Sequence, residues 1–167
     1  MWRALGALWL CAPRGAALWA VQARVPRPAA ALDVAHVPDL ELFVTDDGGR
    51  EIAWIDVYRT TGGFSSGSDV ALHARPARDS EAARCFGSNL LVDTAMRRRG
   101  VATSLLLEVE NTARAWGAKE CLLTALRSHA PSCELYEKLG YDVVASDLGR
   151  QASSVLLGKP VDTQTCQ

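Results

Sequence analysis

The chain has 167 residues, of which 49% are hydrophobic and 22% charged, and its formal net charge at pH 7 is -1. This length suits one domain with its own core, and the composition excludes a disordered chain and one that binds nucleic acid through overall basicity. The five cysteines form no CxxC pair, so neither a zinc site nor a disulfide framework is indicated. They are Cys11, Cys85, Cys121, Cys133 and Cys166.

The first 32 residues differ from the rest of the chain. They contain four arginines and many alanines but no acidic residue, which is the bias of an organelle-targeting presequence. On a helical wheel, three of the arginines share a quadrant opposite apolar side chains. We therefore predict that residues 1–32 are disordered or cleaved and address a chloroplast or a mitochondrion. The alternatives are secretion, a cytoplasmic protein with a misjudged gene start, and an unusual first helix of the domain. Pro13 and Arg14 interrupt the apolar run, so no membrane span is predicted.

The predicted domain, residues 33–167, opens with two strands. The β-prone runs Leu40–Thr45 and Glu51–Tyr58 flank the sequence DDGG, which is typical of the turn in an antiparallel hairpin. Residues 60–80 are rich in glycine and serine, and their composition predicts a long loop.

A βαβ unit is predicted after this loop, because two apolar strand-like runs flank one helical pattern. Gly117 ends the first helix, and Pro131 suits the first turn of the second. The sequence therefore predicts a mixed α/β fold with an antiparallel N-terminal hairpin, a central βαβ unit and flanking helices. The predicted elements are the strand Ala82–Val92, the helix Ala102–Trp116, the strand Glu120–Leu126, the helix Pro131–Leu139, and the strands Tyr141–Ala145 and Ser153–Leu157.

The segment between the Ala82–Val92 strand and the next helix has the features of an anion site. Three consecutive arginines precede Gly100 and the small Ala102. A strand that passes through a glycine-bearing loop into a helix directs backbone N–H groups and the helix dipole at one spot, which favours phosphate. Neither Gly-Lys-Ser/Thr nor G-x-G-x-x-G is present, and the remaining pattern is Arg97-x-x-Gly100-x-Ala102. The alternative for the arginines is a solvated basic turn.

This segment resembles motif A of the GNAT acyltransferases, whose loop, R/Q-x-x-G-x-G/A, binds the pyrophosphate of acetyl-coenzyme A through backbone amides. A second match is SCELYEKLGYDVV, Ser132–Val144, which is similar to a hallmark of the family. The resemblance covers roughly Leu40 to Pro160 and is greatest to chloroplast members of plants and algae. It implies the GNAT acyl-CoA N-acyltransferase fold, whose usual first strand and first helices are expected to be short or missing in this chain. It also implies acetyl-coenzyme A as co-substrate and no metal. The cofactor-binding residues it implies are Leu91, Val92, Arg97, Arg98, Arg99, Gly100, Val101, Ala102 and Thr103.

The resemblance also implies where the chemistry takes place. In the family the sheet opens between its fourth and fifth strands, and the exposed backbone, here that of Leu91 and Val92, meets the acetyl and pantetheine portion. Tyr136 aligns with a tyrosine that protonates the departing sulfur in many members. A thiol titrates near pH 8.5 and a phenol near pH 10, so this proton transfer is feasible. The alternative is that Tyr136 is a packing residue.

The general base is not evident from the sequence. Several members of the family carry a carboxylate on the strand before the arginine loop, where this chain has Ser88 and Asn89. Asp93, His129 and Glu134 are candidates that would act through an ordered water.

The expected reaction is acetyl transfer to a primary amine, by direct attack in a ternary complex. We expect a protein or peptide acceptor, either an N-terminal α-amine or a lysine ε-amine. A small-molecule amine and a non-catalytic regulator that binds acetyl-coenzyme A are the alternatives. Asp69, in the predicted loop, is a candidate for holding a cationic amine, or else a solvated loop charge. No nucleic-acid or membrane partner is expected, and the sequence does not determine the oligomeric state.

Overall fold

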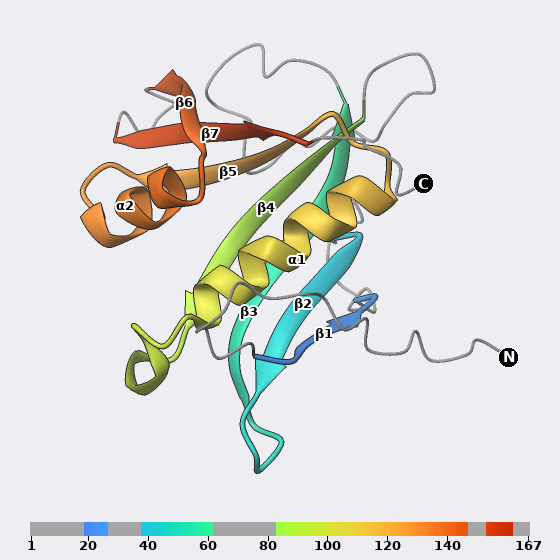
Figure 1. Ribbon diagram of the computed structural model, residues 1–167, viewed down its shortest axis with the longest axis vertical. Helices are drawn as coiled ribbons and strands as arrows, with labels where there is room; N and C mark the ends of the chain where they lie inside the picture. Colours follow the sequence, from blue (N-terminus) through green and yellow to red (C-terminus); the bar gives the residue numbers. More distant parts are fainter. Residues whose placement is uncertain (1–18, 27–37, 62–82, 147–152, 162–167) are drawn as a thin grey trace, which may run out of the picture.

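The computed structural model describes residues 19–26, 38–61, 83–146 and 153–161 (Figure 1). Within them, the chain forms one seven-stranded sheet and two α-helices. The strands are β1 (Val21–Arg24), β2 (Leu40–Thr45), β3 (Glu51–Thr61), β4 (Ala83–Val92), β5 (Glu120–Leu126), β6 (Asp142–Ser146) and β7 (Ser154–Pro160). The helices are α1 (Val101–Ala115) and α2 (Ala130–Lys138), and a short 3-10 turn, η2, covers Thr94–Met96.

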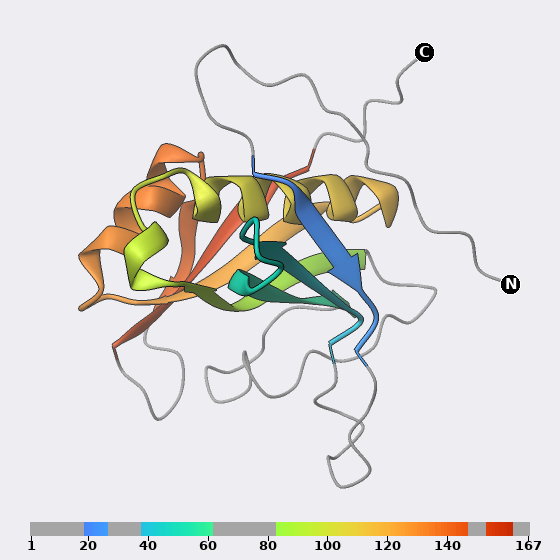
Figure 2. The same ribbon diagram turned by 90° about the horizontal axis from the view of Figure 1, so that it is seen from below.

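The sheet has the strand order β1-β2-β3-β4-β5-β7-β6. The strands from β1 to β4 are antiparallel neighbours. β4 and β5 are parallel neighbours, and the helix α1 connects them. The predicted hairpin and βαβ unit are therefore confirmed, as is the mixed α/β fold. Both helices lie on the same face of the sheet (Figure 2). No helix of the described residues is long and apolar enough to cross a membrane.

The main core lies between this face of the sheet and the helices. Leu105, Leu106 and Val109 of α1 are fully buried, and they belong to one apolar cluster with Ile55 and Val57 of β3. Side chains alternate between the two faces of a strand, so the residues between and beside them, Trp54, Asp56 and Tyr58, point to the opposite face. We call this opposite side the far face.

The far face has its own, smaller apolar cluster. Phe86 of β4, Leu122 of β5 and Leu156 of β7 are buried there, and Tyr58 of β3 packs against them. The Tyr58 and Phe86 rings lie 6.2 Å apart between centroids. This cluster occupies the part of the far face where β4 and β5 still pair, and Asp56 lies next to it along β3.

Strand β1 lies within the tract that the sequence predicts as a targeting segment. Its backbone pairs with β2, and Arg24 forms ion pairs with Glu41 of β2 and Glu51 of β3. The Arg24 guanidinium also stacks 4.6 Å from the Phe43 ring centroid. Four residues of this tract thus contribute to the sheet, and the targeting role of residues 1–32 stays a prediction. Residues 1–18, and the predicted loop beyond residue 61, lie outside the described residues.

Gly87 is the last residue of β4 that pairs with β5, and its position has no room for a side chain. A Cβ atom there would lie 2.7 Å from Leu123 Cδ2 and 3.1 Å from Ile55 Cδ1. Both neighbours are buried in the core under α1. We expect Gly87→Ala to lower the free energy of unfolding by about 1–3 kcal/mol, the usual cost of overpacking a core. Urea unfolding measures this, with Gly48→Ala in the β2–β3 hairpin as the control; an unchanged midpoint for Gly87→Ala would contradict the packing.

Candidate active site

The two parallel strands at the centre of the sheet separate after a short paired stretch. β4 and β5 pair only from Cys85 with Cys121 to Gly87 with Leu123. Beyond these pairs, residues 88–92 of β4 and residues 124–126 of β5 diverge, as Figure 1 shows. We call these two diverging segments the fork. On the sides that face each other across the fork, main-chain groups of both strands have no neighbouring strand among the described residues. This is the opening that the resemblance implies.

A bulge in β4 lies at the fork. Asp56 of β3 faces Ser88 and Trp54 faces Leu91, so two β4 residues, Asn89 and Leu90, occupy the space opposite Ile55 alone. Asn89 has a φ of 56°, a left-handed conformation that asparagine tolerates better than most residues. Bulges redirect side chains and backbone at the point where they occur. Here the bulge turns the last residues of β4 at the fork.

The strand register determines which main-chain groups face the fork. The N–H of Asp93 donates to the carbonyl of Ile52 on β3, at 2.8 Å. Backbone groups alternate in direction along a strand, so the backbone of Leu91 also faces β3, whereas those of Leu90 and Val92 face the fork. The register therefore favours Val92 over Leu91 as the residue whose main chain can bind a pantetheine arm. Leu90, which the sequence analysis did not select, shares that direction.

The loop after β4 delivers the start of α1 to the same end of the sheet. Gly100 is the N-cap residue, with a φ of 81°, a conformation that costs other residues about 1–2 kcal/mol. The first helical hydrogen bond runs from the Ser104 amide to the Gly100 carbonyl, at 3.0 Å. The amides of Val101, Ala102 and Thr103 therefore have no acceptor within the helix. With the helix dipole, they form an anion-binding geometry that fits a pyrophosphate group.

The arginines of this loop have different environments. All three are exposed, but the Nε of Arg97 donates to the Val92 carbonyl at 3.2 Å and so connects the loop to the end of β4. Arg98 has a φ of 63°. The Arg99 carbonyl accepts a hydrogen bond of 2.9 Å from the indole Nε1 of Trp19, which precedes β1. The N-terminal tract therefore contacts the arginine loop directly.

Tyr136 lies on α2 and is only 4% exposed. Its ring packs 6.2 Å from the ring of Tyr141, and it belongs to the main core. Burial raises the pKa of Tyr136 to about 12, so its hydroxyl stays protonated throughout the neutral range. The packing role is thus evident from the contacts, and the catalytic role stays a prediction. Tyr141 is buried, and its hydroxyl has no hydrogen-bond partner among the described residues.

The three candidate bases are placed in different ways. Asp93 is the N-cap of η2, where its carboxylate accepts from the Ala95 amide at 2.9 Å and pairs with Arg50 at 3.3 Å. His129 is exposed at the start of α2, and its Nδ1 lies 2.7 Å from the Ser132 hydroxyl. Glu134 is exposed on α2. Asp93 and His129 therefore have local structural partners, and all three candidates stay predictions.

The structure identifies a carboxylate that the sequence analysis missed. Asp56 of β3 accepts a hydrogen bond of 2.8 Å from Nδ2 of Asn89, the bulge residue of β4. Burial raises the pKa of Asp56, and the Asn89 hydrogen bond partly opposes that rise. The signal in the sequence was a single acidic residue inside the apolar run IAWIDVY. It was not recognised because the strand pairing that brings it to Asn89 is not visible in the sequence.

Comparison with known proteins identifies the family. Residues 9–141 match the family described as Acetyltransferase (GNAT) family. The chain belongs to this family. It is accordingly a GNAT-type acetyltransferase that uses acetyl-coenzyme A. No curated protein sequence matches the chain significantly.

Solved structures of other acetyltransferases share the fold. Arabidopsis thaliana NAA60, in complex with a bisubstrate analogue, has a TM-score of 0.57 at 18% identity, over 74% of this chain and 76% of that one. Arabidopsis thaliana Naa50, in complex with the bisubstrate analogue CoA-Ac-MVNAL, has 0.53 at 14%, over 71% of each chain. Nourseothricin acetyltransferase has 0.54 at 18%, over 73% of this chain and 65% of that one. At such identities these likenesses show the fold alone, and the resemblance to chloroplast members stays a prediction.

Proposed function

We propose that this GNAT protein transfers the acetyl group of acetyl-coenzyme A to a primary amine of a protein or peptide, by direct attack in a ternary complex. The observation that supports this most is the conjunction of the fork with the start of α1. The fork offers main-chain groups that pair with no strand of the described residues, and the start of α1 offers helix amides and a left-handed Gly100. Together they suit an extended thioester that ends in phosphate groups.

The assignment of residues to acetyl-coenzyme A follows the same geometry. The amides of Val101, Ala102 and Thr103 would hold the pyrophosphate, and the Val92 main chain would meet the pantetheine arm. Acetyl-coenzyme A supplies an activated acyl group with a thiolate leaving group. Arg98 and Arg99 are exposed residues of the loop that precedes α1, and their positive charge favours an anionic ligand.

An amine must be neutral to attack the thioester, and this requirement bears on the class of acceptor. A free α-amine titrates near pH 8 and a lysine near pH 10.4, so at pH 7 about a tenth of the former but under a thousandth of the latter is neutral. Peptides with a free N-terminus are therefore the acceptors we propose first, and lysine side chains second. The neighbours in the fold do not decide this, since one is in complex with a peptide-like analogue and another is a nourseothricin acetyltransferase.

Mass spectrometry of an acceptor panel tests the proposal. The full chain is supplied with acetyl-coenzyme A and with peptides that have a free α-amine, a lysine with a blocked N-terminus, or neither, together with a polyamine. An added acetyl group on the peptide with a free α-amine, or on the peptide with a lysine, supports a protein acceptor. Acetylation of the polyamine alone would replace it with a small-molecule acceptor.

Tyr136→Phe is expected to lower kcat by about ten- to a hundredfold while it leaves acetyl-coenzyme A affinity unchanged. With a pKa of about 12, the phenol is a weaker acid than the thiol, so it stabilises the leaving sulfur as a hydrogen-bond donor rather than by full proton transfer. A hydrogen bond to a charged group contributes about 1.5–3 kcal/mol, which gives this range. Steady-state kinetics and cofactor titration measure both quantities, and an unchanged kcat would leave Tyr136 with its packing role only.

A further inference from the structure

A row of side chains crosses the far face of the sheet and ends at the fork. Arg24 pairs in register with Glu41, Glu41 with Asp56, and Asp56 with Ser88. Residues directly opposite one another in antiparallel strands share a face, so these four side chains lie side by side. Asp56 is the carboxylate of this row that adjoins β4, the strand that forms one arm of the fork.

The contacts of Asp56 hold its carboxylate in place but leave it able to accept a proton. Oδ2 accepts the hydrogen bond of 2.8 Å from Asn89 Nδ2. Oδ1 accepts no hydrogen bond from any of the described residues, and Asp56 forms no ion pair among them. The arginine of the row, Arg24, is instead engaged with Glu41 and Glu51. A carboxylate without a cationic partner retains basicity that an ion pair would remove.

The charged and titratable groups around Asp56 come from each strand packed against it. Burial has the largest effect and raises its pKa, Glu41 on β2 raises it further, and Arg24 on β1 lowers it. The Asn89 amide on β4 lowers it through the hydrogen bond. Tyr58, two residues along β3, has its own pKa raised by burial and then by Asp56, Asp39 and Glu41. The carboxylate is thus a stronger base than a free aspartate.

We propose that Asp56 is the general base of the acetyl transfer, with Asn89 as the residue that positions it. This inference rests on the proposed function. It supplies a carboxylate near the end of β4, where the chain itself has Ser88 and Asn89. The carboxylate on the neighbouring strand takes the place of one at Ser88 or Asn89, and the bulge brings Asn89 to it. The acceptor amine accordingly approaches from the far face, the side of the sheet opposite α1 and α2.

Asp56 takes one proton from the acceptor ammonium, directly or through one water, and becomes a neutral carboxylic acid. The freed nitrogen lone pair forms the C–N bond to the acetyl carbon, and the C–S bond breaks, with its electron pair leaving on sulfur. The sulfur takes up one proton, the acetylated nitrogen loses its remaining excess proton to solvent, and Asp56 returns its proton to solvent. The net products are the amide, the free thiol and one proton.

Asp56→Asn tests this directly. The variant keeps the shape and a hydrogen-bonding oxygen for Asn89 but cannot accept a proton. We expect kcat/KM near pH 7 to fall by about tenfold with a peptide α-amine and by about a thousandfold or more with a lysine, in line with the neutral fraction of each acceptor. Because only neutral amine can then react, the variant's rate should rise with pH up to the pKa of the acceptor and approach the wild-type rate there. A rate and pH profile equal to those of the wild type would overturn the proposal.

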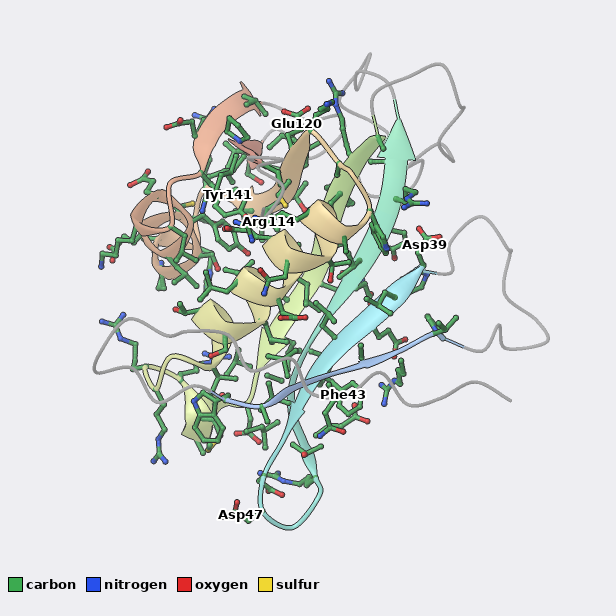
Figure 3. All side chains as sticks on the ribbon, turned by 45° about the vertical axis from the view of Figure 1, so that its right-hand side comes forward. Asp39, Phe43, Asp47, Arg114, Glu120 and Tyr141 are labelled. Atoms are coloured by element: carbon green, nitrogen blue, oxygen red, sulfur yellow. The ribbon has the colours of Figure 1, made fainter. Side chains whose placement is uncertain are left out.

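Folding of the variant is checked in the same preparation. Burial disfavours the charged form of Asp56, so a neutral asparagine is expected to leave the melting temperature unchanged or higher. Asp47→Asn is the matched control, because Asp47 lies at the exposed tip of the β2–β3 hairpin, away from the row (Figure 3). It should keep both wild-type activity and the wild-type pH profile.

Asn89→Gly gives a second test that does not depend on the first. Glycine adopts the positive φ of this position without strain, so the bulge is kept while the amide donor is lost. Loss of that hydrogen bond raises the pKa of Asp56 further, and the base is active only when deprotonated. The acidic limb of the kcat/KM profile should therefore move to higher pH. A limb that stays in place, with the variant folded, would contradict the role of Asp56, whatever the outcome for Asp56→Asn.

Activity of the wild type separates the proposed function from the role of Asp56. If the wild type acetylates no amine of the panel, the proposed function fails and no role can be assigned to Asp56. If the wild type is active, and either Asp56→Asn retains its rate and pH profile or Asn89→Gly retains its acidic limb, the function stands and Asp56 is not the base.

Discussion

Replacement of Gly100 by glutamate is expected to abolish acetyl-coenzyme A binding. Gly100 is the N-cap of α1, directly before the three amides assigned to the pyrophosphate. A glutamate there places a negative charge where the co-substrate carries its own. For unit charges in contact near a protein surface, the repulsion is about 4 kcal/mol, which corresponds to a loss of affinity on the order of a thousandfold. Isothermal titration of the full chain with acetyl-coenzyme A measures the change.

Gly49→Glu is the matched control for this variant. Gly49 has a φ of 78°, close to the 81° of Gly100, and a Cβ atom there would meet nothing within 4 Å. Both variants therefore carry the same backbone strain and the same added charge, but Gly49 lies in the β2–β3 hairpin. Wild-type affinity is expected for Gly49→Glu. Undiminished affinity in Gly100→Glu would instead show that the phosphates bind elsewhere.

Removal of residues 1–26 is expected to destabilise the protein and weaken acetyl-coenzyme A binding together. The deletion removes β1, and with it the two ion pairs of Arg24 and the edge pairing of β2. It also removes Trp19, which holds the Arg99 carbonyl of the cofactor loop. Residues 19–26 are thus expected to act as part of the domain, even though the composition of the whole tract is that of a presequence.

A shorter deletion separates these two roles of the tract. Removal of residues 1–18 keeps Trp19 and β1, and we expect the melting temperature and cofactor affinity to remain those of the full chain. Trp19→Phe in the full chain then isolates the loop contact, since it removes the indole donor and keeps an aromatic ring. Equal stability and affinity for the 1–18 and 1–26 deletions would show that β1 and Trp19 contribute nothing to the domain.

Most of the fold was predictable from local patterns. The strand Leu40–Thr45 and the strand Glu51–Tyr58 were recognised because a strong turn sequence separates two β-prone runs, and β5 because its apolar run stands between two helical patterns. Strand β1 was not recognised. Its four residues, VQAR, carry little β-pattern of their own and become a strand by pairing with β2.

The site was predictable where it depends on the main chain and not where it depends on strand pairing. The glycine and small residue after the arginines indicated the helix amides, because local sequence determines that turn. The role of Asp56 depends on the register between β3 and β4 and on a bulge at Asn89, neither of which has a local signature. The direction of the Leu91 and Val92 backbones depends on the same register.

Release of free coenzyme A thiol reports acetyl transfer by this protein directly. The full chain is incubated with acetyl-coenzyme A, with and without a peptide bearing a free α-amine, and thiol is followed with a chromogenic reagent. We expect release that depends on the peptide, saturates with it, and is matched mole for mole by acetylated product. Saturable acetyl-coenzyme A binding without release for any amine of the panel would contradict the proposed acetyl transfer and identify a binding protein without turnover.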